Sequence, residues 1–188
     1  MNRRRLFSIL TLAITFAGIT ILQSCTKVAK NLHFNLSMQT GSVSLTIPAT
    51  PLTAGTATFG PATNTYNVDS FIKAQTGTLL GVENITSVKI TSCELIINNA
   101  TTTNNLQNFR SCSASFSSNT NATPYQINIP NINDVYATSI NLPVDTTAEL
   151  KSYLGNQFNY SVSGELRRAT TIPLNCTLQF TFSVVVQG

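Results

Sequence analysis

The chain has 188 residues, of which 42% are hydrophobic and 10% are charged, and its formal net charge is +4. This hydrophobic content excludes a disordered chain, because disorder requires low hydrophobicity and a high net charge. Three of the eleven basic residues are Arg3, Arg4 and Arg5, so the rest of the chain is close to neutral and its charges lie singly. That distribution excludes a nucleic-acid-binding surface, which needs clustered Lys and Arg.

The first 24 residues are predicted to be a secretory signal peptide. An apolar run from Leu6 to Leu22 follows the three arginines and ends at the polar residues Gln23 and Ser24. A basic segment, an apolar segment and a small residue before the cut are typical of such a leader. The alternative is the start of a membrane-spanning helix, but a span needs about 20 apolar residues, and this run is shorter and contains Ser, Thr and Gly.

The end of the leader, Leu22-Gln23-Ser24-Cys25, resembles the lipobox of bacterial lipoproteins. The resemblance implies that lipid, including palmitate, is attached to Cys25 and that Cys25 becomes the first residue of the mature protein. Residues 25–30 are then a short lipidated tether, and the membrane is a partner through the lipid. The leader with Gln-Ser-Cys is similar to those of lipoproteins of the Bacteroidota.

The residues after Cys25 bear on the side of the membrane that the domain faces. In lipoproteins of the Bacteroidota, acidic residues shortly after the lipidated cysteine are associated with transfer to the cell surface, and Thr26 to Lys30 contains none. Thr26 also differs from the aspartate that favours the inner membrane in enterobacterial lipoproteins. The resemblance therefore implies the outer membrane, and the periplasmic side rather than the cell surface.

Residues 31–188 alternate apolar and polar side chains over long runs, which is typical of half-buried strands. Leu32 to Met38 and Val43 to Ile47 alternate on either side of Thr40-Gly41, and this predicts a β-hairpin. A loop region rich in Pro and Gly follows, in which Ala57 to Phe59 is expected to form a short strand.

Val68 to Ile72 is predicted to be a short helix, with Asp69 capping its first turn. In the long strand region after this helix, the apolar residues change parity near Ser92. Such a change of face predicts either a β-bulge or two separate strands.

A second helix is predicted from Asp145 to Leu154. Thr146 and Glu149 stand at the spacing of a capping box, and Gly155 fits the left-handed position after a helix. Alternation predicts further strands at Cys112–Phe116, Tyr125–Ile129, Tyr136–Leu142, Phe158–Leu166 and Ile172–Val186. The last of these is the clearest pattern in the chain, so one of its faces is expected to be buried.

Long antiparallel strands with one apolar face can bury those faces by packing sheet on sheet. The expected fold class is therefore all-β, an antiparallel β-sandwich with two short helices. No linker divides residues 31–188, which are expected to form a single domain.

Three cysteines remain once Cys25 carries lipid, namely Cys93, Cys112 and Cys176, and each falls on the apolar parity of its strand. One pair could form a disulfide in an oxidising periplasm. The favoured interpretation is that all three are small buried hydrophobic residues. No C-x-x-C pair or neighbouring histidine accompanies them, so no metal site is expected.

The remaining candidates for chemistry do not form a recognisable set. His33 is the single histidine and lies on the polar parity of its strand, so a surface position is favoured over a catalytic triad. The carboxylates not assigned to helix starts are scattered, and they are Glu83, Glu94, Asp134 and Glu165. Asn131 to Asp134 offers oxygen ligands for calcium but lacks the glycine and distal glutamate of an EF-hand, so an ordinary turn is favoured. We expect no catalytic residue, cofactor or metal ligand.

One modification motif is present. Asp145-Thr146-Thr147 resembles the O-glycosylation acceptor of the Bacteroidota, which implies a sugar on Thr146. The competing interpretation is the helix cap assigned above, and the two roles of the Thr146 hydroxyl conflict.

These observations favour a non-enzymatic binding or adhesion module with a protein or glycan ligand. The polar loops Asn98–Asn108 and Ser117–Thr123 are expected to present the contacts. One alternative is a structural accessory subunit of an envelope complex, held near the membrane by the short tether. The other is a hydrolase, which would require His33 beside a carboxylate and a nucleophile.

Overall fold

The computed structural model describes residues 32–40, 42–51 and 55–188. The predicted signal peptide, the lipobox and the tether lie outside these residues. Within the described part, no helix has the length and apolar character to cross a membrane.

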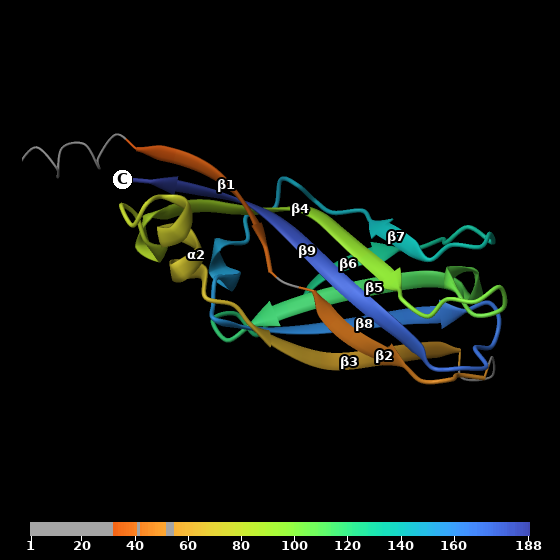
Figure 1. The fold of residues 1–188 in the computed structure, drawn as a ribbon. Coiled ribbons are helices and arrows are strands. Elements are labelled where there is room, and N and C mark those ends of the chain that lie inside the picture. The colour runs from red at the N-terminus through yellow and green to blue at the C-terminus, as the bar shows by residue number, and fades with distance from the viewer. Residues whose placement is uncertain (1–31, 41, 52–54) are drawn as a thin grey trace, which may run out of the picture.

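Two antiparallel sheets pack face to face, which confirms the expected β-sandwich (Figure 1). The first sheet contains β1 (His33–Gln39), β2 (Val43–Ile47), β4 (Ile85–Ile97), β7 (Ser139–Leu142) and β9 (Leu174–Gln187). The second sheet contains β3 (Thr56–Thr65), β5 (Phe109–Ser118), β6 (Tyr125–Ile129) and β8 (Gln157–Leu166). The helical segments are α2 (Val68–Gln75), η2 (Val82–Asn84), η3 (Leu106–Asn108) and η4 (Lys151–Tyr153).

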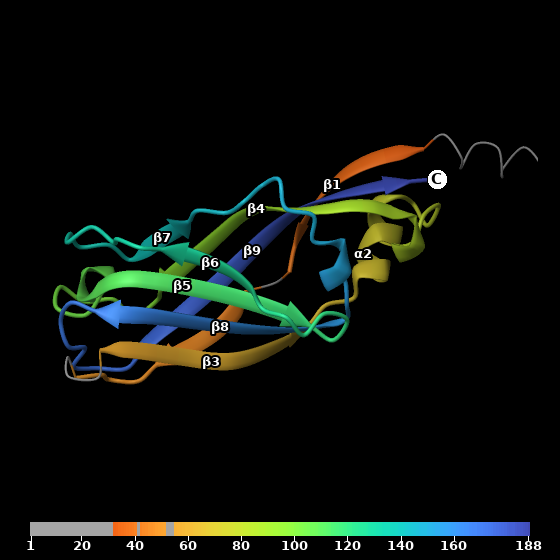
Figure 2. The same ribbon diagram turned by 180° about the vertical axis from the view of Figure 1, so that it is seen from behind.

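The strand order refines the expected sandwich to a jelly roll. One sheet has the order β1-β9-β4-β7, with β2 also on β9, and the other has the order β3-β8-β5-β6. Every connection after β2 passes from one sheet to the other, except the hairpin between β5 and β6. Two sheets wound in this way form the double Greek key of jelly rolls. The crossing connections gather at the two ends of the sandwich (Figures 1 and 2).

The final strand β9 is the centre of the first sheet, as its sequence pattern predicts. It pairs with β1, β2 and β4, and its inward side chains from Leu174 to Val186 are buried. Ile172 lies before the strand begins. The Phe180 ring lies 5.3 Å from that of Phe116 and 5.4 Å from that of Tyr160, both on the opposite sheet. This aromatic contact joins the two layers at the middle of the molecule.

The predicted hairpin between Leu32 and Ile47 is wrong. β1 and β2 do not pair with each other; both run antiparallel to β9, with Gln39 opposite Thr181 and Val43 opposite Leu178. The four residue steps from Gln39 to Val43 therefore lie opposite only three residue steps of β9. The one extra residue changes which face of the sheet the following side chains point to, as a β-bulge does. The side chain of Thr40 is buried at this point, where its hydroxyl accepts a 3.2 Å hydrogen bond from the Tyr160 hydroxyl.

The change of face predicted near Ser92 is confirmed as a bulge inside one strand. The register of β4 against β9 shifts between Ile90 and Ser92, and the buried side chains change parity there. β3 is longer than the predicted strand and also contains a register shift, between Phe59 and Ala62. The strand predicted from Tyr136 is shorter than expected and begins at Ser139.

The first predicted helix is present as α2, but its cap differs from the prediction. The side chain of Asn67 accepts a 2.8 Å hydrogen bond from the Ser70 N–H, which makes Asn67 the N-cap. Asp69 instead accepts hydrogen bonds from Lys73 Nζ, at 2.6 Å, and from the Val82 N–H, at 3.0 Å. Its carboxylate therefore fixes the loop after the helix.

The second predicted helix, from Asp145 to Leu154, is wrong. The Asp145 carboxylate closes a turn by accepting from the Thr147 N–H at 2.9 Å, and a short helical turn begins only at Lys151. The Glu149 carboxylate accepts from Ser87 Oγ at 2.6 Å and from the backbone N–H groups of Val88, at 2.8 Å, and Lys151, at 3.0 Å. Bonding to β4 has thus replaced the capping box. Gly155 is also absent from the described residues with positive φ.

Candidate functional site

The sandwich has two different ends. We call the first the tether end; it comprises Leu32, α2, the loop Gly77–Asn84, residues 118–124 and residues 143–156. The Gly188 N–H donates a 3.0 Å hydrogen bond to the Leu32 carbonyl, so the described chain begins and ends here. We call the opposite end the far end; it comprises residues 98–108, 130–138 and 167–173 (Figure 1).

The two polar loops expected to present contacts lie at opposite ends of the sandwich. Residues 117–123 belong to the tether end, where Asn121 Nδ2 donates a 3.2 Å hydrogen bond to Ser152 Oγ. Residues 98–108 belong to the far end, where Asn99 Nδ2 donates a 2.9 Å hydrogen bond to the Pro173 carbonyl. The two loops therefore belong to separate surfaces of the domain.

The far-end loop 98–108 uses its polar side chains internally. Asn104, Asn105 and Asn108 are buried. Asn108 Nδ2 donates to the Ala169 carbonyl at 2.8 Å, and its Oδ1 accepts from the Asn105 N–H at 2.9 Å. Asn104 Oδ1 accepts from the Thr171 N–H at 2.7 Å. These amides are the internal framework of the far end and are not available to a ligand.

The neighbouring loop, residues 130–138, carries the exposed apolar surface of the far end. Val135 is 60% exposed and Tyr136 is 55% exposed. The loop is fixed on both sides, because the Ile132 N–H donates to the Arg110 carbonyl at 2.7 Å and the Ala137 carbonyl accepts from the Leu106 N–H at 3.1 Å. An aromatic and an aliphatic side chain are thus held outward on an ordered loop.

Charged side chains contact the loop that carries this pair. Two guanidinium nitrogens of Arg168 donate hydrogen bonds to the Asp134 carboxylate, one of them at 2.7 Å. Arg167 donates to the Ile132 carbonyl at 2.8 Å. The hydrogen bond from Arg168 holds the pKa of Asp134 below its ordinary value. Arg110 lies 3.3 Å from Glu165. Three arginines against two acids leave the far end slightly positive.

The same contacts are inconsistent with a calcium site at Asn131–Asp134. Both carboxylate oxygens of Asp134 are taken by Arg168, and the side chain of Ile132 is buried. Among the residues that the structure describes, no three His, Cys, Asp or Glu side chains come together in a way that could hold a metal ion.

The three described cysteines are free and buried, in agreement with the favoured interpretation of Cys93, Cys112 and Cys176. Burial raises the pKa of each thiol to about 12. Because the thiolate is the reactive form, these side chains act as core residues rather than as nucleophiles.

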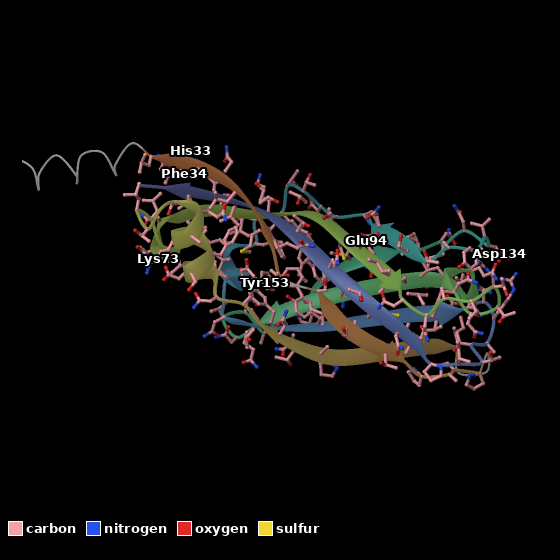
Figure 3. The ribbon with its side chains drawn as sticks, in the orientation of Figure 1. His33, Phe34, Lys73, Glu94, Asp134 and Tyr153 are labelled. Atoms are coloured by element: carbon pink, nitrogen blue, oxygen red, sulfur yellow. The ribbon has the colours of Figure 1, made fainter. Side chains whose placement is uncertain are left out.

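The candidates for a hydrolase site are not brought together. His33 is exposed on the outer face of β1, opposite Gln187. Figure 3 shows His33, Glu94 and Asp134 spread along the length of the molecule. In the described part of the chain, no hydrogen bond or ion pair joins His33 to a carboxylate.

Thr146 lies in an exposed turn and does not cap a helix. Its hydroxyl makes no hydrogen bond to any of the described residues, so the conflict between capping and modification is removed.

The space between the sheets is filled. Two internal cavities of about 10 Å³ each are lined by apolar core residues from both sheets. A volume of that size holds about one water molecule. The sandwich interior described here therefore does not contain a chamber for a small-molecule ligand.

No protein-family model and no curated protein matches this sequence. The chain is similar in fold to solved virus structures. One is from Desmodium yellow mottle tymovirus, at 12% identity and a TM-score of 0.28, covering 82% of this chain and 89% of that one. Another is the decameric BFDV capsid protein, at 10% identity and a TM-score of 0.38, covering 84% and 100%. A third is the infectious bursal disease virus VP2 subviral particle, at 10% identity and a TM-score of 0.38. That match covers 83% of this chain but only 33% of the viral chain.

Proposed function

We propose that this protein is a lipid-anchored protein of the bacterial outer membrane, facing the periplasm, and that it is a non-enzymatic binding or adhesion module. Its ligand contact is the far end. The observation that carries this proposal is the exposed pair Val135 and Tyr136, held on an ordered loop at the end of the sandwich opposite to the point where the chain enters.

The tether length supports this orientation. Seven residue steps separate Cys25 from Leu32, and a fully extended chain covers at most about 24 Å over that number. β9 contains 14 residues and runs between the two ends. At a rise of about 3.3 Å per residue, such a strand is about 45 Å long. The far end is therefore the part of the domain that a lipid on Cys25 leaves accessible.

The chemistry of the far end supports protein or glycan binding. Tyrosine and arginine are enriched at the centres of protein interfaces, because each combines a large contact area with directed hydrogen bonds. The loop is already ordered by its contacts to Arg110 and Leu106. Little conformational entropy is then lost when a ligand binds.

The lipid anchor is tested by Cys25→Ser. In cells given labelled palmitate, the wild-type protein takes up label and fractionates with membranes, whereas the variant does neither. A variant that remains membrane-bound, together with an unlabelled wild-type protein, contradicts the anchor. Protease treatment of intact cells tests the side of the membrane: digestion without disruption of the outer membrane contradicts the periplasmic location.

The binding role of the far end is tested by a photo-crosslinking amino acid at Tyr136, which is 55% exposed, and, as the control, at Leu79 of the tether end, which is 60% exposed. We expect an adduct from position 136 and none of the same kind from position 79. A glycan array probed with the wild-type protein and with Tyr136→Ala distinguishes a sugar ligand from a protein ligand. Equal adducts from both positions, or array binding that survives Tyr136→Ala, would exclude the far end as the contact surface.

The alternative of a structural accessory subunit is favoured by the short tether, which keeps the domain close to its membrane. Extraction in mild detergent distinguishes the two functions. Co-purification with a larger assembly through the far end supports the accessory subunit, and a protein that is extracted alone and binds its ligand supports the independent module.

We also propose a sugar on Thr146, in line with the resemblance of Asp145-Thr146-Thr147 to a glycosylation acceptor. The exposed turn supports the proposal, because a transferase needs access to the hydroxyl. The intact masses of the wild-type protein and of Thr146→Ala, both purified from the native host, decide it. If the two differ only by the substitution, Thr146 is unmodified.

A further inference from the structure

The loop Gly77–Asn84 at the tether end exposes apolar side chains. Leu79 is 60% exposed and Val82 is 40% exposed, while Leu80 between them is buried. A single exposed apolar residue needs no explanation, because folded proteins expose many. The meaning of this pair depends on how the loop holds it and on what lies beside it.

The loop is held in an uncommon conformation. Gly77 has a φ of 62° and Thr78 has a φ of 66°. Positive φ is rare for a β-branched residue, and such strain persists only where the surrounding structure enforces it. Here the Thr78 N–H donates to the Lys73 carbonyl at 2.7 Å, and the Val82 N–H donates to the Asp69 carboxylate at 3.0 Å. The residue that follows the strained one is Leu79, the more exposed of the two apolar side chains.

The loop lies beside the point where the tether joins the domain. Asn84 Nδ2 donates a 3.3 Å hydrogen bond to the Gln187 carbonyl, and the Gly188 N–H donates to the Leu32 carbonyl. Both views of the ribbon show the loop after α2 next to the C-terminus (Figures 1 and 2). Phe34, on the inner side of β1, is also only partly buried at this end (Figure 3).

We infer that Leu79 and Val82 form a second, non-covalent contact with the membrane, in which they enter the headgroup region of the bilayer that carries the anchor. The inference rests on the proposed lipid at Cys25, because the seven residue steps of the tether confine Leu32 to within about 24 Å of the lipid. Exposed apolar side chains at that distance meet the bilayer interface, where their burial is favourable. The contact fixes the orientation of the domain and directs the far end away from the membrane.

The charges at this end favour apolar insertion over attraction to anionic lipid. At and near the tether end, the described chain has three lysines and four acids. The lysines are Lys73, Lys89 and Lys151, and the acids are Asp69, Glu83, Asp145 and Glu149. With Lys27 and Lys30 of the tether included, the net charge of this end is close to zero. The membrane contact is therefore expected to depend weakly on anionic lipid and on salt.

The contact is tested with the chain from Thr26 onward, which contains every element of the sandwich, tethered through an N-terminal histidine tag to vesicles containing a nickel-chelating lipid. The remaining lipids are phosphatidylethanolamine and phosphatidylglycerol. An environment-sensitive dye is attached at Leu79→Cys, and separately at Val135→Cys of the far end, because the native cysteines are buried. We expect a blue shift of the dye and quenching by doxyl-labelled lipid at position 79 only. Equal spectra at the two positions, both like those without vesicles, would overturn the inference.

Matched double variants measure the strength of the contact. Leu79→Ser with Val82→Ser removes the proposed contact, and Val135→Ser with Tyr136→Ser removes a similarly exposed pair at the far end. We expect the first double variant to dissociate from the tagged vesicles about 10-fold faster in imidazole, because two partly buried aliphatic side chains are lost from the interface. The second should match the parent. Equal dissociation of both variants and the parent, or a loss of the effect in vesicles without phosphatidylglycerol, contradicts apolar insertion.

The design separates this inference from the lipid anchor. The histidine tag replaces the lipid, so the vesicle result does not depend on whether Cys25 is modified, whereas labelled palmitate in cells tests Cys25 alone. A soluble partner that binds the dye-labelled loop would shift the dye at position 79 without vesicles, and that result would also overturn the inference.

Discussion

The two ends of the sandwich are closed by different chemistry. The far end is held by the buried amides of Asn104, Asn105 and Asn108 and by the hydrogen bonds from Arg168 to the Asp134 carboxylate. The tether end is closed by α2 and by carboxylates, because Asp69 accepts from the Val82 N–H and Glu149 accepts from the Val88 N–H. In the described chain the arginines lie at the far end or, for Arg110, at the adjoining start of β5, whereas the lysines lie toward the tether end. Arginine makes directed, planar contacts, whereas lysine is a hydrated point charge. This difference supports the two proposals, in which the far end contacts a specific ligand and the tether end contacts the bilayer.

What the two ends share is the core between them, and the largest expected effect lies there. Phe180→Ala removes a buried ring in contact with Phe116 and Tyr160, and should lower the free energy of unfolding by about 3–5 kcal/mol. Val185→Thr, on the outer parity of the same strand, should have a much smaller effect. Denaturant titration measures both. Equal losses would mean that the face assignment of β9 is wrong.

A change at the far end should come next in size. Asn108→Ala leaves the Asn105 N–H and the Ala169 carbonyl without their partners in a buried site, and should lower the free energy of unfolding by about 3 kcal/mol. Asn133→Ala, exposed at the same end, is the control and should be close to neutral. Hydrogen exchange should show lost protection at Thr171 with little change in α2. Loss of protection at both ends would contradict their independence.

The corresponding change at the tether end should be smaller. Asn67→Ala removes the N-cap of α2, which should lower the free energy of unfolding by about 1 kcal/mol. Its partner at the cap is the Ser70 backbone, so Ser70→Ala serves as the control. Exchange should accelerate in α2 and in the loop that Asp69 fixes. If Asn67→Ala destabilises as much as Asn108→Ala, the two closures are of equal strength.

The smallest expected effect is the acid dependence of the two ends. Hydrogen bonds from Lys73 to Asp69 and from Arg168 to Asp134 hold the pKa of each acid below its ordinary value of 3.8. Each pair therefore stabilises the fold above pH 3.8, and this contribution is lost as the pH falls through the lower, folded pKa. Both acids are exposed, so solvent screens the interactions and the effect is small.

Melting temperatures of the wild-type protein, Asp69→Asn and Asp134→Asn, measured from neutral to acid pH, check this. Each variant should show a shallower decline below pH 3.8 than the wild-type protein. A steeper decline of the melting temperature in either variant would contradict a lowered pKa of that acid in the folded protein.

The sequence by itself determined the elements whose signal is local. A period of two along residues 174–187 requires a strand with one buried face, and the change of parity near Ser92 requires a bulge or a break, because side chains alternate strictly across a sheet. The helix predicted at Val68–Ile72, which extends to Gln75 in the structure, and the buried state of the three described cysteines follow from similar patterns. These predictions held because each depends on residues that are close together in the chain.

Only the tertiary structure decided which segments meet. A bulge and a hairpin produce the same parity change between β1 and β2, and the choice depended on β9 being long enough to pair with both. Glu149 stands at capping-box spacing, but Ser87 and Val88 of β4 offered its carboxylate better partners than the start of a helix. The far end joins Gln107, Asp134 and Arg168 from three separate connections, because a jelly roll gathers its crossings at two ends. No local pattern records those distances, since they are set by the packing of one sheet on the other.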